Sequence, residues 1–301
     1  MSGEKTYADW IAVDWGTSNL RAWAMTSDGA IKDMVTSDKG MSSLTPEQFE
    51  PTLISLTEQW LGTTETPVIA CGMVGARQGW AEAPYRTVPT TPHGALSPCS
   101  TTDNRISVYI LPGLKQDKHP DVMRGEETQI AGFLADNPDF DGVLCLPGTH
   151  TKWVHISAKE IVSFQTVMTG ELFALLSKNS VLRHSVDSKD WDEDAFIDAV
   201  SNTTARPETL AAQMFQIRAS HLLEATQPSV SKSKLSGLLI GAELAATKPY
   251  WLGQQIALVG DPVLNAIYLA ALRAQGLDAT QHTSDDLTVK GLTAAYKDLI
   301  S

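Results

Sequence analysis

The 301-residue sequence predicts an α/β protein built from two related halves, with a ligand-binding cleft between them. Strand patterns alternate with helical patterns along the chain, which is typical of mostly parallel sheets joined by right-handed crossovers. One pattern of strands occurs twice, at residues 10–36 and 142–168, and a Gly-Thr pair follows the first strand in both copies. A chain of this length suits about two domains, so the repetition indicates two domains of one ancestral type.

The elements of the first half follow from hydrophobic periodicity and turn residues. Residues 10–36 predict three strands, because WIAVD is apolar, LRAWAMT alternates, and AIKDMVT follows an Asp-Gly turn. The other expected elements are an amphipathic helix at 46–61, short strands at 67–71 and 106–112, and a helix at 125–136 whose first turn is acidic.

The second half repeats the strand pattern and then departs from it. Its expected elements are strands at 142–146, 151–156 and 160–168, helices at 170–178 and 208–226 with an inserted polar segment near 185–208, a strand at 235–241 leading into a helix, a strand at 255–260 and a helix at 262–275. The segment NPDFDG (137–142) interrupts the pattern and puts the domain boundary near 136–141. The predicted domains are therefore 1–138 and 139–301.

The composition argues against several classes of protein. The net charge is -12 and no polybasic run occurs, whereas nucleic-acid-binding proteins need clustered Lys and Arg. The three cysteines form no CxxC pair, which fits a reduced cytoplasmic protein, and Cys71 and Cys145 lie in apolar runs that predict burial. Residues 1–10 show no signal-peptide pattern, and polar residues interrupt the apolar stretch 258–272. We therefore expect a cytoplasmic protein without a membrane span.

Residues 13–21, VDWGTSNLR, combine an acidic residue at the end of a buried strand with a Gly-Thr-Ser turn. The backbone N–H groups of such a turn can bind phosphate oxygens, and glycine lets a ligand approach the backbone closely. Asp14 could hold Mg²⁺ opposite those phosphates. An ordinary strand turn with a capping Asp is the alternative interpretation.

Residues 146–153, LPGTHTKW, place a second Gly-Thr turn in the other half of the chain. Two such turns, one in each predicted domain, favour a nucleoside triphosphate as the ligand held between them. His150 in this turn is interpreted as a polar loop residue without a catalytic role.

Two further motifs lie in the first half. Glu126 and Glu127 begin a predicted helix, where the helix dipole favours an ionised carboxylate. Phosphoryl transfer to an alcohol uses a carboxylate that accepts the hydroxyl proton, although plain helix capping also explains the pair. Residues 71–80, CGMVGARQGW, follow a buried strand, where open α/β sheets form ligand crevices. Arg77 in this loop could pair with a carboxylate, and a surface Arg in a Gly-rich loop is the alternative.

Six blocks occur in order along nearly the whole chain: DWGTSNLRAW, GMVGARQGW with EAPY, MRGEETQI, LPGTHTKWV, TGELFALL and LLIGAELAA. Together they resemble the 2-keto-3-deoxygalactonokinase family. The first and fourth blocks also match the two phosphate motifs of the actin, sugar-kinase and chaperone-ATPase superfamily. The resemblance implies two ribonuclease-H-like (actin-like ATPase) domains around an interdomain cleft.

The resemblance further implies ATP-dependent phosphorylation of the 6-hydroxyl of 2-dehydro-3-deoxy-D-galactonate in galactonate catabolism, with Mg²⁺ as cofactor. The N-terminal domain would bind the sugar acid and the C-terminal domain the nucleotide. The implied catalytic residues are Glu126, Glu127 and Asp14, and Asp14 would also hold the metal. The implied phosphate-binding residues are Gly16, Thr17, Ser18, Gly148 and Thr149, the adenosine-binding residues are Gly241, Ala242, Glu243, Gly260, Asp261 and Leu264, and the sugar-acid-binding residues are Arg77, Gln78, Trp80 and Arg124.

Two positions depart from the superfamily pattern. Gly260-Asp261 stands where a Gly-Gly pair is common in the adenosine loop, which leaves the adenine contacts open. Glu126 and Glu127 stand where Asp is common, so the catalytic carboxylate is assigned by its position at the start of the helix. Which Glu is the base, and whether Arg77 or Arg124 binds the substrate carboxylate, stays open.

Other functions on the same fold are a kinase for another sugar acid or a ketose, and a non-catalytic nucleotide or sugar sensor. Asp14, the two Gly-Thr turns and the paired Glu residues count against the sensor. The expected partners are ATP and a small sugar acid, without nucleic acid or membrane, and a homodimer stays open.

Overall fold

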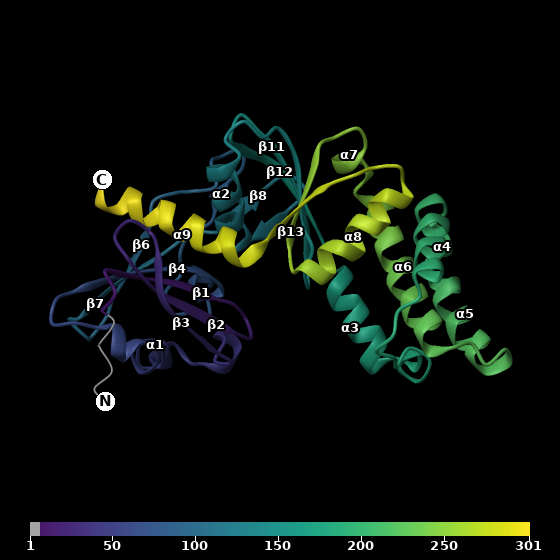
Figure 1. Cartoon of the computed structure of the whole chain (residues 1–301), viewed down its shortest axis with the longest axis horizontal. Coiled ribbons are helices and arrows are strands. Elements are labelled where there is room, and N and C mark those ends of the chain that lie inside the picture. Colours follow the sequence, from purple (N-terminus) through teal and green to yellow (C-terminus); the bar gives the residue numbers. More distant parts are fainter. Residues whose placement is uncertain (1–6) are drawn as a thin grey trace. The chain divides into compact units, whose positions relative to one another are not determined.

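The computed structural model describes residues 7–301, which form two compact units (Figure 1). The first unit contains residues 7–140, 157–163 and 284–301, and the second contains 141–156 and 164–283. The placement of 284–301 differs from the predicted domain 139–301. Residues 1–6, part of the segment in which we expect no signal peptide, lie outside the described residues. The predicted cleft between the domains stays a prediction.

The first unit is organised around a mixed sheet with the strand order β3-β2-β1-β4-β7-β6. β1, β2 and β3 are antiparallel neighbours, whereas β4 lies parallel to β1 and β7 lies parallel to β4. β1 and β4 are buried at every position except Asp14 and Pro67, which explains their continuous apolar runs. The strands are β1 (Trp10–Trp15), β2 (Leu20–Met25), β3 (Ile31–Ser37), β4 (Thr66–Gly72), β6 (Ser97–Cys99) and β7 (Ile106–Ile110).

Helices and a small second sheet complete the first unit. The segment predicted as one helix at 46–61 instead forms a short helix between two 3-10 turns, and the helix predicted at 125–136 is confirmed. The small sheet has the order β5-β8-β9. These elements are η1 (Met41–Ser43), η2 (Pro46–Gln48), α1 (Phe49–Thr57), η3 (Glu58–Trp60), η4 (Met73–Gly75), β5 (Arg86–Thr87), β8 (Leu114–Gln116), β9 (Asp121–Met123), α2 (Glu126–Asp136) and α9 (Ser284–Ile300).

Helix α9 ends the chain but packs on the sheet that begins it, and it runs beside α2 (Figure 1). Its apolar residues recur at helical spacing, and Val289, Leu292 and Tyr296 pack in one cluster with Trp10. The rings of Trp10 and Tyr296 stack with their centroids 4.5 Å apart. This apolar face explains why residues 284–301 group with the first unit.

The second unit repeats the topology of the first. Its sheet has the order β12-β11-β10-β13-β14, with β11 antiparallel to β10, β13 parallel to β10 and β14 parallel to β13. The same sequence of neighbours is found for β3-β2-β1-β4-β7. The internal duplication inferred from the two Gly-Thr turns therefore extends to the strand order. The strands are β10 (Gly142–Leu146), β11 (Thr151–Ser157), β12 (Glu160–Val167), β13 (Ile256–Gly260) and β14 (Thr280–Thr283).

The helices of the second unit are α3 (Thr169–Asn179), η5 (Val181–His184), α4 (Glu193–Ala205), η6 (Pro207–Thr209), α5 (Leu210–Leu223), α6 (Pro228–Ala246), α7 (Lys248–Trp251) and α8 (Pro262–Ala274). The strand predicted at 235–241 is wrong, because these residues lie inside α6. A short apolar run cannot distinguish a buried strand from a buried helix. Gly237 and Gly241 face α4, and a Cβ added to them would lie 2.5 Å from the Phe196 carbonyl oxygen and 2.7 Å from that of Val200, respectively. The two helices can therefore cross closely only with glycine at these positions.

The polar segment predicted as an insertion near 185–208 contains α4. This helix packs along α6, and its residues Phe196 and Val200 are fully buried in the core of the second unit. The segment is thus part of the helical layer rather than an addition to its surface.

The buried state predicted for Cys71 and Cys145 is confirmed, and both thiols are free. Among residues 7–301, every helix is too short or too polar to cross a lipid bilayer.

Candidate active site

Asp14 stands in the first unit at the carboxyl end of the buried strand β1. Its carboxylate forms an ion pair of 2.6 Å with Arg21 on β2, and Arg21 also pairs with Asp285 at the start of α9. The side chain of Asp14 is 20% exposed, so one edge of the carboxylate can still meet a ligand. This placement follows from the hairpin register, which sets Asp14 opposite Arg21.

The first Gly-Thr turn links β1 to β2 and is exposed at Thr17 and Ser18. The Gly16 N–H donates to the Asn19 carbonyl at 2.9 Å and closes the turn. The Gly16 and Thr17 carbonyls accept from the backbone N–H groups of Met41 and Ser42, each at 3.0 Å. The segment at Met41 and Ser42 therefore fixes the carbonyl groups of the turn, while the side chains of Thr17 and Ser18 stay accessible to solvent.

Two glycines bring the ends of β1 and β4 and the start of α2 together. Gly72 ends β4 with a φ of 91°, and a Cβ there would lie 2.7 Å from the Trp15 carbonyl oxygen and 3.3 Å from Oδ1 of Asp14. Gly125 precedes α2 with a φ of 109°, and its Cβ would lie 3.5 Å from the Cα of Gly72. Side chains are disfavoured at both angles. This convergence places Asp14 and the start of α2 on the same side of the first sheet.

Glu126 and Glu127 begin α2, as predicted, but their surroundings differ. Glu127 is 1% exposed, and its two carboxylate oxygens accept from the Gly125 N–H at 2.9 and 2.7 Å. Burial raises the pKa of Glu127 to about 7, and the neighbouring Glu126 carboxylate acts in the same direction. Glu126 is half-buried and accepts from the Arg124 backbone N–H at 3.1 Å. Glu126 is thus the more accessible carboxylate of the pair.

The four predicted sugar-acid residues fall into two groups. Arg77 and Gln78 are exposed in the loop after β4, and Trp80 is half-buried against Phe49 and Trp15. Arg124 is only 9% exposed. The four residues come from two segments of the first unit.

The surroundings of the Arg124 guanidinium are unusual for a buried cation. Its Nη2 donates to the Ala83 carbonyl at 2.8 Å, and its Cζ lies 4.3 Å from the Tyr85 ring centroid. Its Nε and Nη1 are buried without a hydrogen-bond partner among residues 7–301. Buried donors normally have partners, so Arg124 has two unsatisfied donors with which an acceptor could pair.

The second Gly-Thr turn lies at the edge of a pocket in the second unit. A Cβ added to Gly148 would meet nothing within 4 Å, so its backbone is open to a ligand. Thr149 is exposed, and its carbonyl accepts from the Glu171 N–H in the first turn of α3 at 3.0 Å. His150 pairs with Glu171 at 2.6 Å, in agreement with its interpretation as a polar loop residue.

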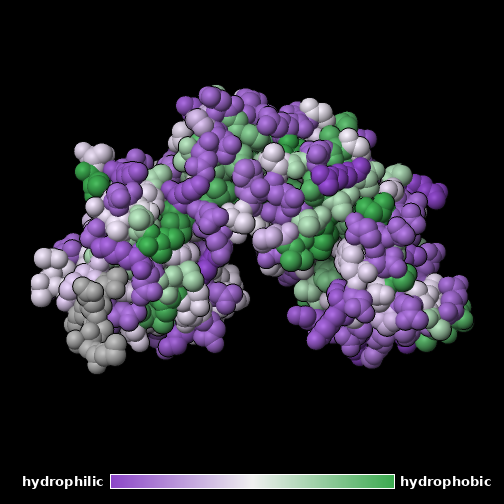
Figure 2. Space-filling view, in the orientation of Figure 1, coloured by the Kyte–Doolittle hydropathy of each residue, from purple (hydrophilic) through white to green (hydrophobic). Residues whose placement is uncertain are grey.

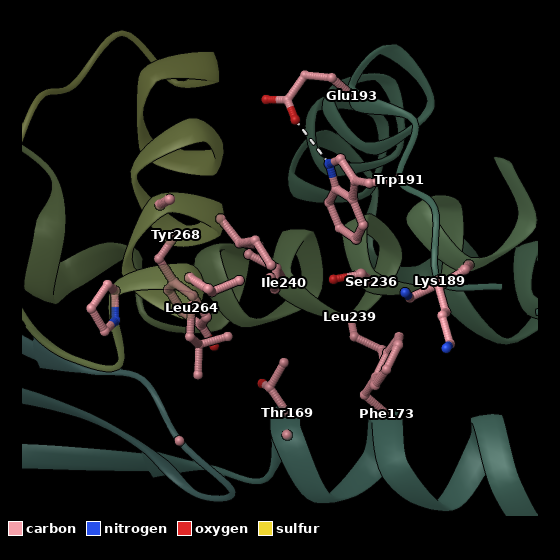
Figure 3. Close-up of a pocket in the computed structure, with 17 residues that line it drawn as sticks. Thr169, Phe173, Lys189, Trp191, Glu193, Ser236, Leu239, Ile240, Leu264 and Tyr268 are labelled. Carbon is pink, nitrogen blue, oxygen red and sulfur yellow. Dashed lines mark hydrogen bonds between the residues drawn. The ribbon is translucent and has the colours of Figure 1, made fainter. Parts of the chain in front are cut away.

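The pocket has a volume of 780 Å³ and lies between α3, α6, α8 and the segment before α4 (Figure 3). Figure 3 shows the Trp191 ring and Phe173 entering it from opposite sides, while Ile240 and Leu264 lie toward its α8 side. The Trp191 indole N–H donates to Glu193 at 2.9 Å, which orients the ring. Over this region, between α3 and α8, the visible surface carries a hydrophobic area (Figure 2). A cavity of this size with mostly apolar walls is typical of small-molecule sites.

The predicted adenosine residues meet this pocket only in part. Of the six, Leu264 alone is among the lining residues, whereas Gly241 packs against α4 and Glu243 is enclosed at 2% exposure. The remaining predicted residues, Ala242 on α6 and Gly260 and Asp261 before α8, are not among its lining residues. Because 235–241 is helical, α6 instead presents Ser236, Leu239 and Ile240 to the pocket, at the i, i+3, i+4 spacing of one helix face.

Asp261 has a structural role that the sequence analysis did not assign. Its carboxylate accepts from the Val263 and Leu264 N–H groups at 2.9 and 3.1 Å and caps α8. The sequence analysis also missed Trp191 and Phe173. An aromatic residue within the polar segment 185–208 was the available signal for Trp191.

A magnesium ion is compatible with the residues around Asp14. Within residues 7–301, no group of three or more His, Cys, Asp and Glu side chains is arranged to hold a metal. Mg²⁺ is commonly bound through one or two carboxylates together with substrate phosphates and water. The partly exposed Asp14 carboxylate beside the Gly-Thr turn fits this mode of binding.

The two sheets of equal topology, each with a Gly-Thr hairpin, define the class of actin-like ATPases and sugar kinases. The activator of 2-hydroxyisocaproyl-CoA dehydratase from Clostridium difficile, solved with bound ADPNP, shares the fold with a TM-score of 0.50 at 12% identity, covering 96% of this chain and 94% of that one. The family model described as 2-keto-3-deoxy-galactonokinase matches residues 14–295. The chain belongs to this family of kinases.

Relatives cover nearly the full length of the chain. It is 36% identical to the 2-dehydro-3-deoxygalactonokinase of Escherichia coli (strain K12), over 95% of this chain and 96% of that protein. It is 38% identical to a protein of Rhizobium meliloti (strain 1021) assigned the same activity, over 96% of both chains. A crystal structure of a protein from Sinorhizobium meliloti, assigned to the same enzyme, matches with a TM-score of 0.88 at 36% identity, over 96% of this chain and 99% of that one.

Proposed function

We propose that this chain transfers the γ-phosphoryl group of ATP to the 6-hydroxyl of 2-dehydro-3-deoxy-D-galactonate. The observation that carries the proposal is the second Gly-Thr turn at the edge of the 780 Å³ pocket, in a member of this kinase family. A pocket of this size can enclose a nucleoside, and the open backbone at Gly148 suits its phosphates.

The two Gly-Thr turns, Asp14 and Glu126 each have a role in the proposed reaction. Glu126 orients the acceptor hydroxyl and takes its proton, which leaves the oxygen free to attack phosphorus as the bond to the leaving ADP breaks. The Gly16–Ser18 and Gly148–Thr149 turns bind phosphate oxygens through their backbone N–H groups. Asp14 would hold Mg²⁺, which neutralises charge on the phosphates when bound. The free cysteines fit a reaction in the reducing cytoplasm.

The substrate is tested by a coupled assay of ADP release with a panel of keto-deoxy sugar acids, other sugar acids and simple ketoses. We expect turnover with 2-dehydro-3-deoxy-D-galactonate to exceed that with every neutral ketose. Turnover only with neutral sugars would contradict the substrate assignment. Binding of ATP without turnover on any substrate would favour a sensor.

Replacing Trp191 should weaken ATP binding, because the base would lose an aromatic surface in the pocket. Stacking of a base on an aromatic ring contributes about 1–3 kcal/mol, so Trp191→Ala should raise the KM for ATP about 5- to 150-fold. The KM for the sugar acid at saturating ATP should stay the same. Phe215→Ala is the matched control, because Phe215 lies on α5 with 66% of its surface exposed. An unchanged KM for ATP in Trp191→Ala would show that the adenine base does not stack on Trp191 and binds elsewhere.

Arg124 is the better candidate for the substrate carboxylate, because two of its donors are buried without partners among the described residues. Losing a charged hydrogen-bonded pair costs about 2–5 kcal/mol, so Arg124→Ala should raise the KM for the sugar acid at least ~30-fold. Arg124→Lys keeps the charge but loses the bidentate geometry, and it should also raise the KM for the sugar acid. The KM for ATP should not change in either variant.

Arg77→Ala is the comparison for this prediction, since Arg77 is exposed in the same unit. A larger rise in the KM for the sugar acid in Arg77→Ala than in Arg124→Ala would show that Arg77 binds the substrate carboxylate. If both variants keep a normal KM, the carboxylate is bound elsewhere, for instance by backbone N–H groups.

A further inference from the structure

Glu243 lies in the last turn of α6, and its buried carboxylate accepts hydrogen bonds from three different elements. The Trp153 indole N–H on β11 donates to its Oε1 at 2.8 Å, and the Tyr268 hydroxyl on α8 donates to its Oε2 at 2.9 Å. The Thr169 hydroxyl, at the start of α3, also donates to Oε2. A buried carboxylate needs such partners, because its desolvation is otherwise costly.

The hydrogen-bond network around Glu243 continues through Tyr268 to Thr151 on β11. The Tyr268 hydroxyl lies 2.8 Å from Oγ1 of Thr151, so the Thr151 hydroxyl can donate to it while Tyr268 donates to Glu243. Burial raises the pKa of Glu243 to about 7, while its three hydrogen bonds act in the opposite direction. The carboxylate is thus a shared acceptor that joins α3, α6, α8 and β11.

Two members of this network also form the walls of the pocket. Thr169 and Tyr268 both line it, Thr169 from the start of α3 and Tyr268 from α8 (Figure 3). Thr169 is the only residue of α3 that is buried among those described. The bond from Thr169 to Glu243 therefore fixes the first residue of α3 to the interior of the second unit, while Phe173 and Leu176 further along the helix pack against its apolar core.

The start of α3 in turn contacts the second Gly-Thr turn. The Glu171 N–H donates to the Thr149 carbonyl at 3.0 Å. A Cβ added to Gly170 would lie 2.3 Å from the Gly148 carbonyl oxygen, so the two backbones are in direct contact. A shift of α3 must therefore move the turn or break these contacts.

We propose that Glu243 is a positioning residue for the nucleotide: through Thr169 it holds the start of α3 against the Gly148–Thr149 turn, and through Tyr268 it holds the facing wall of the pocket. The inference rests on the proposed function, because it takes the nucleotide to be the ligand of the pocket. It replaces the direct adenosine contact predicted for Glu243 with an indirect role through residues that line the pocket.

The test removes the hydroxyl that links Glu243 to α3 without changing the shape of the side chain. Thr169→Val should raise the Kd for ATP, measured by calorimetry, by up to about tenfold, because the hydrogen bond to Glu243 no longer holds the start of α3 against the turn. Thr169→Ser keeps the hydroxyl and should restore binding. The KM for the sugar acid at saturating ATP should not change, since the sugar acid is assigned to the first unit.

Thr203→Val is the matched control. Thr203 is a buried threonine of α4 in the same unit, and its hydroxyl has no hydrogen-bond partner among residues 7–301. This variant should bind ATP normally. Glu243→Gln, which cannot accept three donors, should weaken ATP binding at least as much as Thr169→Val.

Two results would overturn the inference. The first is normal ATP binding in Thr169→Val and Glu243→Gln, even with a lowered Tm, because the network would then only stabilise the fold. The second is a wild-type protein that binds no ATP, which would overturn the proposed function as well. A wild-type protein that binds ATP but does not phosphorylate the sugar acid would refute the proposed function and leave the role of Glu243 standing.

Discussion

Glu126→Gln should lower kcat about 10²–10⁴-fold while the KM values stay nearly unchanged, because it removes a general base without removing a contact that binds substrate. The amide keeps the shape of the side chain and can still accept the Arg124 N–H, which the carboxylate now accepts at 3.1 Å. The start of α2 should therefore be preserved. The measurement is steady-state kinetics by ADP release, with the Tm as a check on folding.

The choice between the two carboxylates rests on accessibility. Neighbouring residues on a helix point about 100° apart, so Glu126 and Glu127 cannot both face the substrate. Glu127 is 1% exposed and binds the Gly125 N–H with both oxygens, whereas Glu126 is half-buried. Gly125 has no side chain to obstruct the approach of a substrate to Glu126.

Glu127→Gln is the comparison, and should lower kcat much less than Glu126→Gln. The opposite ranking would transfer the role of base to Glu127, whose pKa of about 7 also suits proton transfer near neutral pH. Normal kcat in both variants would exclude a carboxylate base on α2.

Asp14→Asn should remove most of the turnover, with a fall in kcat on the order of 100-fold or more, because a lost metal contact costs several kcal/mol of transition-state stabilisation. The substitution is nearly isosteric, and Arg21 keeps its second partner Asp285. The Tm should therefore change little. The dependence of the rate on Mg²⁺ concentration should shift to higher concentrations, which loss of stability alone would not cause.

Asp9→Asn provides the control for this substitution. Asp9 is also ion-paired, with Lys32 at 3.3 Å, but it is located at the opposite end of the β1 strand from Asp14. Its loss should leave both kcat and the Mg²⁺ dependence unchanged. An Asp14→Asn variant with near wild-type kcat would exclude Asp14 as the metal ligand.

Much of the fold could be predicted from the sequence because its signals are local. The apolar strands ending at Asp14 and at Leu146, the alternating strands that follow them, and the helix starting at Glu126 each appear in a few adjacent residues. Hydrophobic periodicity depends only on which neighbours share a face. The similarity between the two Gly-Thr turns predicted two related halves, and the order of strands in the two sheets bears this out.

The walls of the pocket depend on contacts between residues far apart in the chain. Leu264 could be predicted as a pocket residue, since the helix that carries it was predicted. Trp191, Phe173 and Leu239 come together only after α3, α4 and α6 have packed. The residues of α6 at 235–241 resemble a strand because both sides of the helix are buried, one of them against α4. An apolar run of this kind has no polar face from which a period could be read.

The sequence by itself determined the fold class, the two Gly-Thr turns and the carboxylates near the first of them, because each is encoded in a short segment with its own geometry. The tertiary structure alone decided which carboxylate is accessible and which is enclosed. Glu127 and Glu243 have the same chemistry as Glu126, yet both are buried whereas Glu126 is only half-buried. Burial depends on what packs over a side chain from elsewhere in the chain, and this information is absent from the neighbouring sequence.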